Sequence, residues 1–227
     1  LRGIYACVQD LTDKAKRLPE TRPTLDELGQ LSAEVSRLPV VVSELRIIQQ
    51  TATRVRGWLK KNFRYLTMHE KFSRHDMEHR VSRAAFLAIL AEIDALPARV
   101  PERDVMAELL TRADGLAERI EGALDASASL ETMEKLHADS LEQPIILSQA
   151  SVLLATMTRA REWMRSAEKY VQVATTDDTV PIASMPALGT LATALCREAE
   201  DLPVAQVREL SKRVRDCGLR VMMQCLR

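Results

Sequence analysis

The sequence has few of the residues that interrupt helices or build catalytic sites. Its 227 residues include only seven glycines, and aromatic residues make up 4%. The scattered glycines form no GxGxxG motif and no P-loop, which excludes the glycine-rich loops that cradle phosphate groups. No Ser-His-Asp or Cys-His arrangement indicates a nucleophilic enzyme. We therefore expect a chain without a catalytic site, a cofactor or a small-molecule substrate of its own.

Long apolar runs are also missing. None approaches the roughly 18 residues of a membrane span, and no charged-then-apolar segment of the secretory type opens the chain. Alanine, leucine, arginine and glutamate are abundant instead, and they favour helix because they lose little conformational freedom in it. The sequence begins at Leu1. We expect a fragment of a longer chain that is neither secreted nor embedded in a membrane.

Cysteines and histidines do not form a convincing metal-binding pattern. The four cysteines have no CxxC spacing and no neighbouring histidines, so we expect free, mostly buried thiols in a reducing compartment. They are Cys7, Cys196, Cys217 and Cys225. His75 and His79 lie one helical turn apart, near His69, a spacing that can hold a metal ion. Asp76, however, stands where a zincin motif has glutamate. The favoured interpretation is a solvated helix face.

Hydrophobic residues recur at alternating steps of three and four, which is the spacing of a coiled-coil seam along a helix. No stretch shows the sustained alternation of a strand. The three clearest seams are Val41, Leu45, Ile48, Ala52, Val55 and Leu59; Ile146, Ala150, Leu153, Met157, Ala160, Met164, Ala167 and Val171; and Val207, Leu210, Val214, Cys217 and Val221. The sequence therefore predicts an all-α protein.

Prolines separate these periodic runs. Each proline restricts the residue before it and fits the first turn of a new helix, so each predicts a corner between two helices. The corners are Leu18-Pro19, Leu38-Pro39, Leu96-Pro97, Gln143-Pro144 and Leu202-Pro203. The predicted helices span residues 4–18, 24–37, 40–66, 69–96, 102–124, 128–142, 145–173, 187–201 and 204–226.

One part of the sequence is written twice. Residues 38–58 and 143–163 align without a gap, and the only two tryptophans occupy the same place in each copy. The matched pairs are Pro39/Pro144, Ser43/Ser148, Thr51/Thr156, Thr53/Thr158, Arg54/Arg159, Arg56/Arg161 and Trp58/Trp163. We expect each tryptophan ring to flank its seam and to cover the gap where a neighbouring helix pair packs.

The duplication predicts the organisation of the whole chain. A first block, 1–143, contains the repeat 39–97 and acidic helices; a second block, 144–227, contains the repeat 144–203 and a C-terminal helix. A helix with a single apolar seam cannot bury it alone, whereas neighbouring hairpins bury each other's seams. We expect about nine antiparallel helices in an elongated, spectrin-like array.

Charge is segregated along the chain although the formal net charge is +0. Residues 54–83 have nine cationic side chains against three acidic ones, interleaved with aromatics, whereas residues 102–142 have eleven acidic against four basic. The nine cations are Arg54, Arg56, Lys60, Lys61, Arg64, Lys71, Arg74, Arg80 and Arg83. The favoured interpretation is the solvated face of long helices, and binding of a phosphate backbone is the alternative.

The Leu-Pro corners, and the apolar seam that ends in tryptophan, are similar to features of a known protein family. Ala95-Leu96-Pro97, Glu200-Asp201-Leu202-Pro203 and Arg54-x-Arg56-x-Trp58 resemble the PLU-type helical region of the JmjC lysine-specific histone demethylases. In that family a helical array lies between the catalytic half and a downstream PHD finger. Met222 stands where a third tryptophan would fall. The chain has neither the iron-binding triad nor the cysteine-rich finger of the family.

The resemblance implies a non-catalytic scaffold that binds other proteins of a chromatin complex, in the nucleus or otherwise in the cytoplasm. The parent chain would then hold any demethylase activity. Two alternatives stay open: a nucleic-acid-binding module that uses residues 54–83, with DNA as the ligand, and a spectrin-like cytoskeletal or adaptor repeat.

Overall fold

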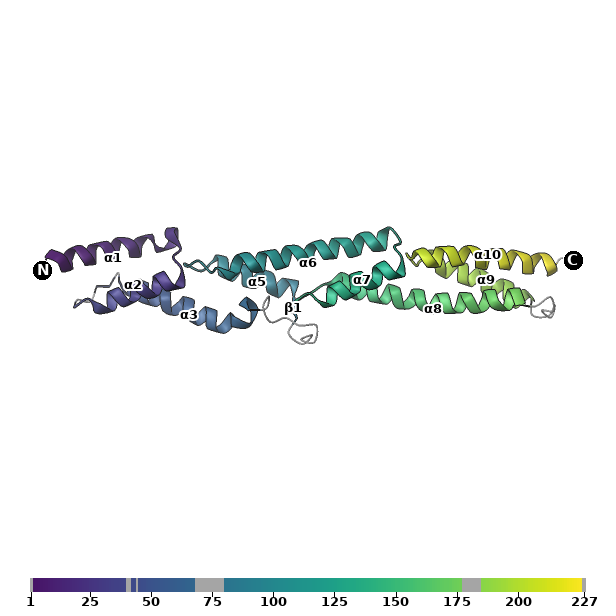
Figure 1. Ribbon diagram of the computed structural model, residues 1–227, viewed down its shortest axis with the longest axis horizontal. Coiled ribbons are helices and arrows are strands. Elements are labelled where there is room, and N and C mark those ends of the chain that lie inside the picture. Colours follow the sequence, from purple (N-terminus) through teal and green to yellow (C-terminus); the bar gives the residue numbers. More distant parts are fainter. Residues whose placement is uncertain (1, 40–41, 44, 68–79, 177–184, 226–227) are drawn as a thin grey trace. The chain divides into compact units, whose positions relative to one another are not determined.

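The structure is a computed structural model that describes residues 2–39, 42, 43, 45–67, 80–176 and 185–225. Within these ranges the chain forms nine helices and two strands of two residues each. They are α1 (Arg2–Thr21), α2 (Leu25–Arg37), α3 (Arg46–Leu66), β1 (Val81–Ser82), α5 (Arg83–Asp94), α6 (Glu102–Asp125), α7 (Leu130–Leu141), β2 (Ile145–Ile146), α8 (Ser148–Thr176), α9 (Met185–Glu200) and α10 (Ala205–Cys225) (Figure 1). The prediction of an all-α protein is confirmed.

The proline corners are only partly where the sequence places them. Pro19 lies inside α1, which continues to Thr21, so the predicted corner at Leu18-Pro19 is wrong. The proline nitrogen has no N–H and costs the last turn one backbone hydrogen bond, but the chain does not reverse there. It reverses at Arg22, whose φ is 42° and whose N–H donates to the Leu18 carbonyl over 3.0 Å.

Other prolines end a helix without opening the next one. Helix α3 begins at Arg46, several residues after Pro39. Pro144 precedes the strand β2, and α8 begins only at Ser148. Both helices therefore start later than predicted. Of the predicted helix 69–96, residues 69–79 lie outside the described part, and α5 begins at Arg83.

The start of α5 has a local cause. The Ser82 side chain accepts a hydrogen bond from the Ala85 N–H, an N-cap that satisfies one of the free donors of the first turn. Thr24 caps α2 in the same way, with Glu27 completing a capping box, and Ser129 caps α7 through the Thr132 N–H. The chain thus marks several helix starts with a hydroxyl residue and not with proline.

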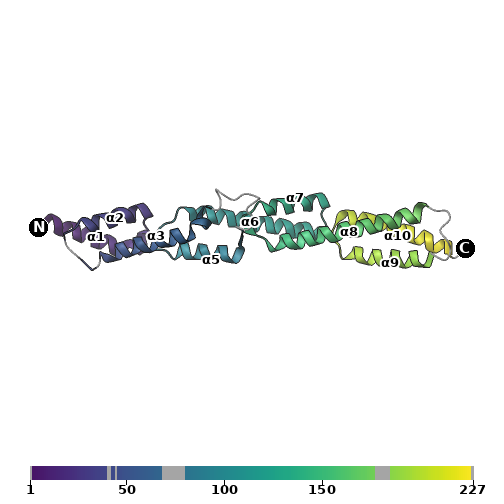
Figure 2. The ribbon, with the colours of Figure 1, turned by 90° about the horizontal axis from the view of Figure 1, so that it is seen from below.

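The chain divides into two compact units, residues 1–111 and 112–227. In unit 2, the helices α8, α9 and α10 pack against one another, and α7 packs on α8 (Figures 1 and 2). Their shared core consists of Leu153, Met157, Ala160, Trp163, Ala167, Tyr170 and Val171 from α8, Leu195 and Ala199 from α9, and Val207, Leu210, Val214, Cys217 and Val221 from α10. All five predicted seam positions of α10 are buried.

In unit 1, α2 packs on α3. The predicted seam positions Ile48, Ala52 and Val55 are buried there, and Leu28 of α2 is fully buried.

The second predicted seam, in unit 2, fails at its first position, because Ile146 belongs to β2 and is 48% exposed. The predicted blocks 1–143 and 144–227 rest on the duplicated sequence, whereas the compact units rest on packing. The blocks therefore stay a prediction.

Two turns, one in each unit, have matching geometry at the offset of the repeat. Arg22 and Ser127, 105 residues apart, are the two non-glycine residues with positive φ among the described residues, at 42° and 54°. Thr24 and Ser129, also 105 apart, are both helix N-caps. Backbone hydrogen bonds hold the turns similarly: Arg99 N–H donates to the Pro23 carbonyl (3.0 Å), and Ala205 N–H to the Ala128 carbonyl (3.2 Å). The structural likeness therefore includes residues before position 38.

At Gly218, helix α10 packs closely against α9. A Cβ added there would lie 2.9 Å from the Ala192 Cβ. Gly122, in the part of α6 that belongs to unit 2, would have no atom within 4 Å of an added Cβ. Both glycines are helical, so the intrinsic gain in helix propensity from alanine is the same for each.

We expect Gly218→Ala to destabilise unit 2 by about 1–3 kcal/mol, because the α9–α10 contact must open. Gly122→Ala should instead stabilise it by up to about 1 kcal/mol. Urea denaturation followed by circular dichroism measures both changes. If the two variants shift stability in the same direction, the close packing of α9 on α10 is wrong.

Candidate functional site

The cationic stretch predicted from the sequence lies mainly on one helix. Arg54, Arg56, Lys60, Lys61 and Arg64 are all exposed on α3. With Arg46 they make six cations in this helix, which contains no acidic residue. The buried stripe of α3, which includes Ile48 and Val55, faces away from them. Burial of that stripe therefore turns the cations towards solvent.

The aromatic residues between the cations have different environments. Phe63 is 56% exposed. The Arg64 guanidinium lies 4.8 Å from the centre of the Tyr65 ring and donates a hydrogen bond to its hydroxyl. Such a cation–π contact orders the arginine beside the ring. The exposed side of α3 thus has a phenyl ring as well as positive charge, a combination that can contact nucleic acid or an acidic protein surface.

The other four predicted cations come after α3 in the sequence. Lys71, Arg74 and Phe72 lie outside the described residues, as do His69, His75, His79 and Asp76. Arg80 is half-buried, and burial lowers its pKa. Arg83 is exposed at the start of α5. The five exposed cations of α3 that the sequence predicted form the α3 cationic face: Arg54, Arg56, Lys60, Lys61 and Arg64.

The two tryptophans make matching hydrogen bonds but are buried to different extents. Trp163 is 4% exposed, and its indole N–H donates to the Leu195 carbonyl of α9 over 2.9 Å. Trp58 is half-buried, and its indole N–H donates to the Glu92 carboxylate of α5 over 2.7 Å. In both copies the ring links the tryptophan helix to the following helix of its unit. Trp163 is a core residue, but it lies on the buried stripe of α8, between Ala160 and Ala167, and does not flank it as predicted. Trp58, in contrast, is only half-buried.

The four prolines that begin and end the two repeats also differ in burial. Pro39 is exposed, Pro97 and Pro203 are half-buried, and Pro144 is buried. The duplicated sequence positions therefore do not have equal roles in the two units.

A cavity lies beside each of the two matching turns. In unit 1 it measures about 450 Å³, and its lining includes Arg22, Asp94, Arg99 and Arg103. The Arg103 side chain donates two hydrogen bonds to the Asp94 carboxylate, which lowers the pKa of that group. Sequence reasoning missed this site, because it placed the corner at Leu18-Pro19 and not at Arg22.

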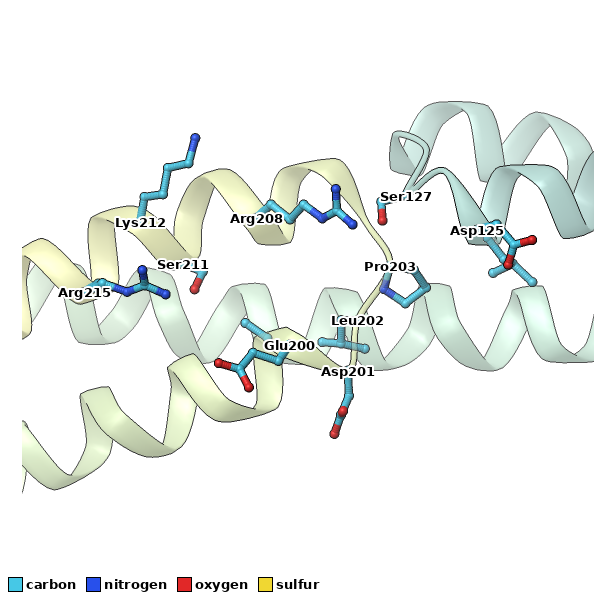
Figure 3. A pocket seen from close by; sticks show the side chains of 12 residues that line it. Asp125, Ser127, Glu200, Asp201, Leu202, Pro203, Arg208, Ser211, Lys212 and Arg215 are labelled. Atoms are coloured by element: carbon cyan, nitrogen blue, oxygen red, sulfur yellow. The ribbon is translucent and has the colours of Figure 1, made fainter.

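The second cavity, in unit 2, measures about 700 Å³. It is lined by the α6–α7 turn, by the end of α9 and by one face of α10 (Figure 3). The charged side chains around it are Asp125, Glu200, Asp201, Arg208, Lys212 and Arg215. The alignment of Thr24 with Ser129 at the offset of 105 residues was the signal in the sequence that could have revealed both turns.

No metal site arises from the described residues: they contain no group of three or more histidine, cysteine, aspartate or glutamate side chains that could hold an ion. Cys7, Cys196 and Cys217 are free thiols, as predicted. Only Cys217 is buried, whereas Cys7 is exposed and Cys196 half-buried, so the prediction of mostly buried thiols is wrong for these three. The side chain of Cys225 lies outside the described part. In the same residues we find no helix with the length and apolar character needed to cross a membrane.

The packed helices of the described residues place the chain in the class of all-α proteins. In sequence, the chain is similar to lysine-specific demethylase JMJ17 of Arabidopsis thaliana, with 24% identity over 139 residues. The similarity covers 58% of this chain and 11% of that protein. No model of a protein family matches the chain, and no solved structure matches it. The chain is therefore distantly related to the lysine-specific demethylases.

The different burial of the tryptophans predicts different costs of removing them. Trp163→Ala should destabilise the protein by roughly 3–5 kcal/mol, because a buried ring leaves a cavity. Trp58→Ala should cost only roughly 1–2 kcal/mol. Thermal denaturation with Trp→Phe controls, which keep a ring but remove the indole N–H, measures both. Equal losses at the two positions would contradict the difference in burial.

Proposed function

We propose that this chain is a non-catalytic helical scaffold, a segment of a nuclear chromatin regulator that corresponds to the PLU-type helical region of a JmjC lysine-specific demethylase. The observation that carries the proposal is the similarity to a lysine-specific demethylase, which involves only 11% of that protein. A segment of this size, made of packed helices, suits a spacer and a binding surface. Any demethylase reaction of the parent protein would belong to residues outside this chain.

The composition of the surface supports a binding role. Unit 2 exposes several large apolar side chains on α10: Leu219, Met222 and Met223 are 53%, 46% and 60% exposed. Methionine adapts its shape to a partner because its side chain is unbranched and polarisable. Met222 is also the residue that stands where a third tryptophan was expected, so the second copy ends in a flexible apolar surface. Other proteins of a chromatin complex are the proposed partners.

The scaffold proposal predicts that partner binding depends on the folded bundle. The chain fused to a biotin ligase, with the same nuclear import signal on all versions, should label a defined set of chromatin proteins. Val214→Asp places a charge at a fully buried position of α10 and should abolish that labelling, because a buried unpaired charge unfolds the bundle. Arg213→Asp, at the exposed position next to Val214, is the folded control.

Two results would contradict the proposal. One is the same labelled set with and without Val214→Asp. The other is a set made of cytoskeletal proteins, which would favour the spectrin-like adaptor. A purified chain that demethylates a methyl-lysine peptide with iron and 2-oxoglutarate would refute the non-catalytic part separately.

A nucleic-acid-binding module is the second candidate, and the α3 cationic face favours it. Six cations without an acidic residue on one helix create a positive field that attracts phosphates. We still expect weak DNA binding, because the residues are spread over the solvent side of the helix and do not line a groove. The expected dissociation constant is no tighter than roughly 10⁻⁴ to 10⁻⁶ M, the non-specific range.

The DNA test compares two sets of five charge reversals to glutamate. The first changes the α3 cationic face. The matched control changes the exposed cations Arg159, Arg165, Lys169, Arg213 and Arg220 of unit 2. Nanomolar binding by the wild-type chain, with a log–log salt slope of about −0.9 per phosphate contact and lost only in the first set, would overturn the expectation. Fluorescence anisotropy with a duplex at several salt concentrations provides the measurement.

A further inference from the structure

The turn in unit 1 contains a guanidinium-binding arrangement made of backbone. Arg22 sits at the turn with φ 42°, and its Nη2 donates to the carbonyls of Ile93 (3.2 Å), Asp94 (3.1 Å) and Leu96 (3.2 Å). These carbonyls lie at and just beyond the C-terminal end of α5. The last carbonyls of a helix lack partners within the helix, and the helix dipole makes this end negative. A guanidinium satisfies both conditions.

In unit 2 the corresponding position has no such side chain. Ser127 lies 105 residues after Arg22 and shares its positive φ. Its side chain is too short to reach the end of α9 as Arg22 reaches the end of α5. Ser127 is 6% exposed, and its Oγ is one of two buried side-chain polar atoms in the described residues without a hydrogen-bond partner. A buried hydroxyl without a partner is unfavourable, because burial removes its hydrogen bonds to water.

The residues of unit 2 that correspond to Ile93, Asp94 and Leu96 lie around the cavity of unit 2. The matching dipeptides Leu96-Pro97 and Leu202-Pro203 are 106 residues apart. The same offset takes Ile93, Asp94 and Leu96 to Ala199, Glu200 and Leu202. All three of these residues line the 700 Å³ cavity together with Ser127. The side chain of Glu200 also retains the negative charge that Asp94 has in unit 1.

We propose that this cavity binds the guanidinium group of an arginine side chain from a partner protein, which takes in unit 2 the place that Arg22 takes in unit 1. The carbonyls at the end of α9 and the Ser127 Oγ accept hydrogen bonds from the guanidinium, and the Glu200 carboxylate pairs with its charge. This inference rests on the proposed scaffold function and deepens it by naming the chemistry of a partner group.

Three cations of α10 also line the cavity: Arg208, Lys212 and Arg215. Figure 3 shows Arg208 and Ser127 facing the same space, yet the Arg208 side chain makes no hydrogen bond or ion pair with the described residues. Cations in the wall do not prevent guanidinium binding, since Arg99 and Arg103 line the cavity in unit 1 beside Arg22.

The formal charges of the lining cancel, and α10 begins beside the cavity at Ala205, so the preference for a cation comes from the wall formed by the end of α9. Asp125, Glu200 and Asp201 offset the three cations of the lining. Helices α6 and α9 both end at the cavity, at Asp125 and Glu200, and each contributes the negative end of its dipole. An anionic ligand would instead bind along α10, through Arg208 and Lys212. The two ligand classes therefore use different walls of the cavity.

The test titrates N-acetyl-arginine-methylamide into the intact chain and follows backbone amide shifts by NMR. Shifts are expected in residues 199–203 and at Ser127. The citrulline and lysine derivatives should bind at least about tenfold more weakly, because citrulline lacks the charge and lysine lacks the planar fork of donors. Arginine binding no tighter than that of either derivative, or none at all, would overturn the proposal.

Two variants transfer the arrangement between the units. Ser127→Arg should fill the cavity from within, abolish binding of the arginine derivative and raise the melting temperature; Arg22 shows that arginine tolerates this turn. Arg22→Ser should open a second site, so that shifts also occur in residues 93–97. Arginine binding that survives Ser127→Arg in a folded chain would place the ligand elsewhere and refute the proposal.

Arg208→Gln separates a cation site from an anion site. Removal of this charge should tighten binding of the arginine derivative and weaken any binding of inorganic phosphate. Phosphate that binds the wild type at the same residues more tightly than the arginine derivative, and is lost in Arg208→Gln, would show that the cavity is an anion site. None of these measurements needs a partner protein, so their failure is distinct from failure of the scaffold proposal.

Discussion

Each helix of this chain has one apolar stripe, and the need to bury that stripe determines the rest of the structure. An isolated helix of this length is marginal in water, so its stability comes from packing. In unit 2, Val214 of α10, Leu153 of α8 and Leu195 of α9 are all buried in this way. To bring such stripes together the chain must reverse direction within a few residues, which makes the turns the second constraint on the fold.

The turns are held by backbone hydrogen bonds, and this leaves their side chains free to differ. Pro23 and Ala128 each accept a hydrogen bond from a residue that follows a Leu-Pro dipeptide, so both turns share this backbone contact whichever side chain stands at the residue with positive φ. Arg22 and Ser127 can therefore occupy equivalent positions although one is a long cation and the other a short hydroxyl. The fold tolerates the exchange, but the cavity beside the turn is larger in unit 2, at about 700 Å³, than in unit 1, at about 450 Å³.

The sequence predicts helices well wherever a seam is long, as for α10, and it places α7 within two residues of its observed ends. The prediction fails where a local signal in the sequence, such as a proline, is overridden by the turn that the folded chain makes nearby. Pro19 suggests a corner, but α1 continues to Thr21 because the chain turns at Arg22. The α3 cations follow from the pattern, since residues opposite a buried stripe must face solvent. The cavities do not, because each depends on segments some 70 residues apart that meet only in the folded unit.

A duplicated fold of this kind separates what is constrained from what can diverge. The seam of each copy is fixed by burial, whereas the residues that face solvent or a turn are fixed only by what they bind. The tryptophans illustrate the difference: both reach the following helix, but Trp163 donates to a backbone carbonyl in the core, and Trp58 to the exposed carboxylate of Glu92. Functional differences between the copies are therefore to be sought where equivalent positions have unlike side chains, and Arg22 and Ser127 are the pair for which the structure reveals a chemical consequence.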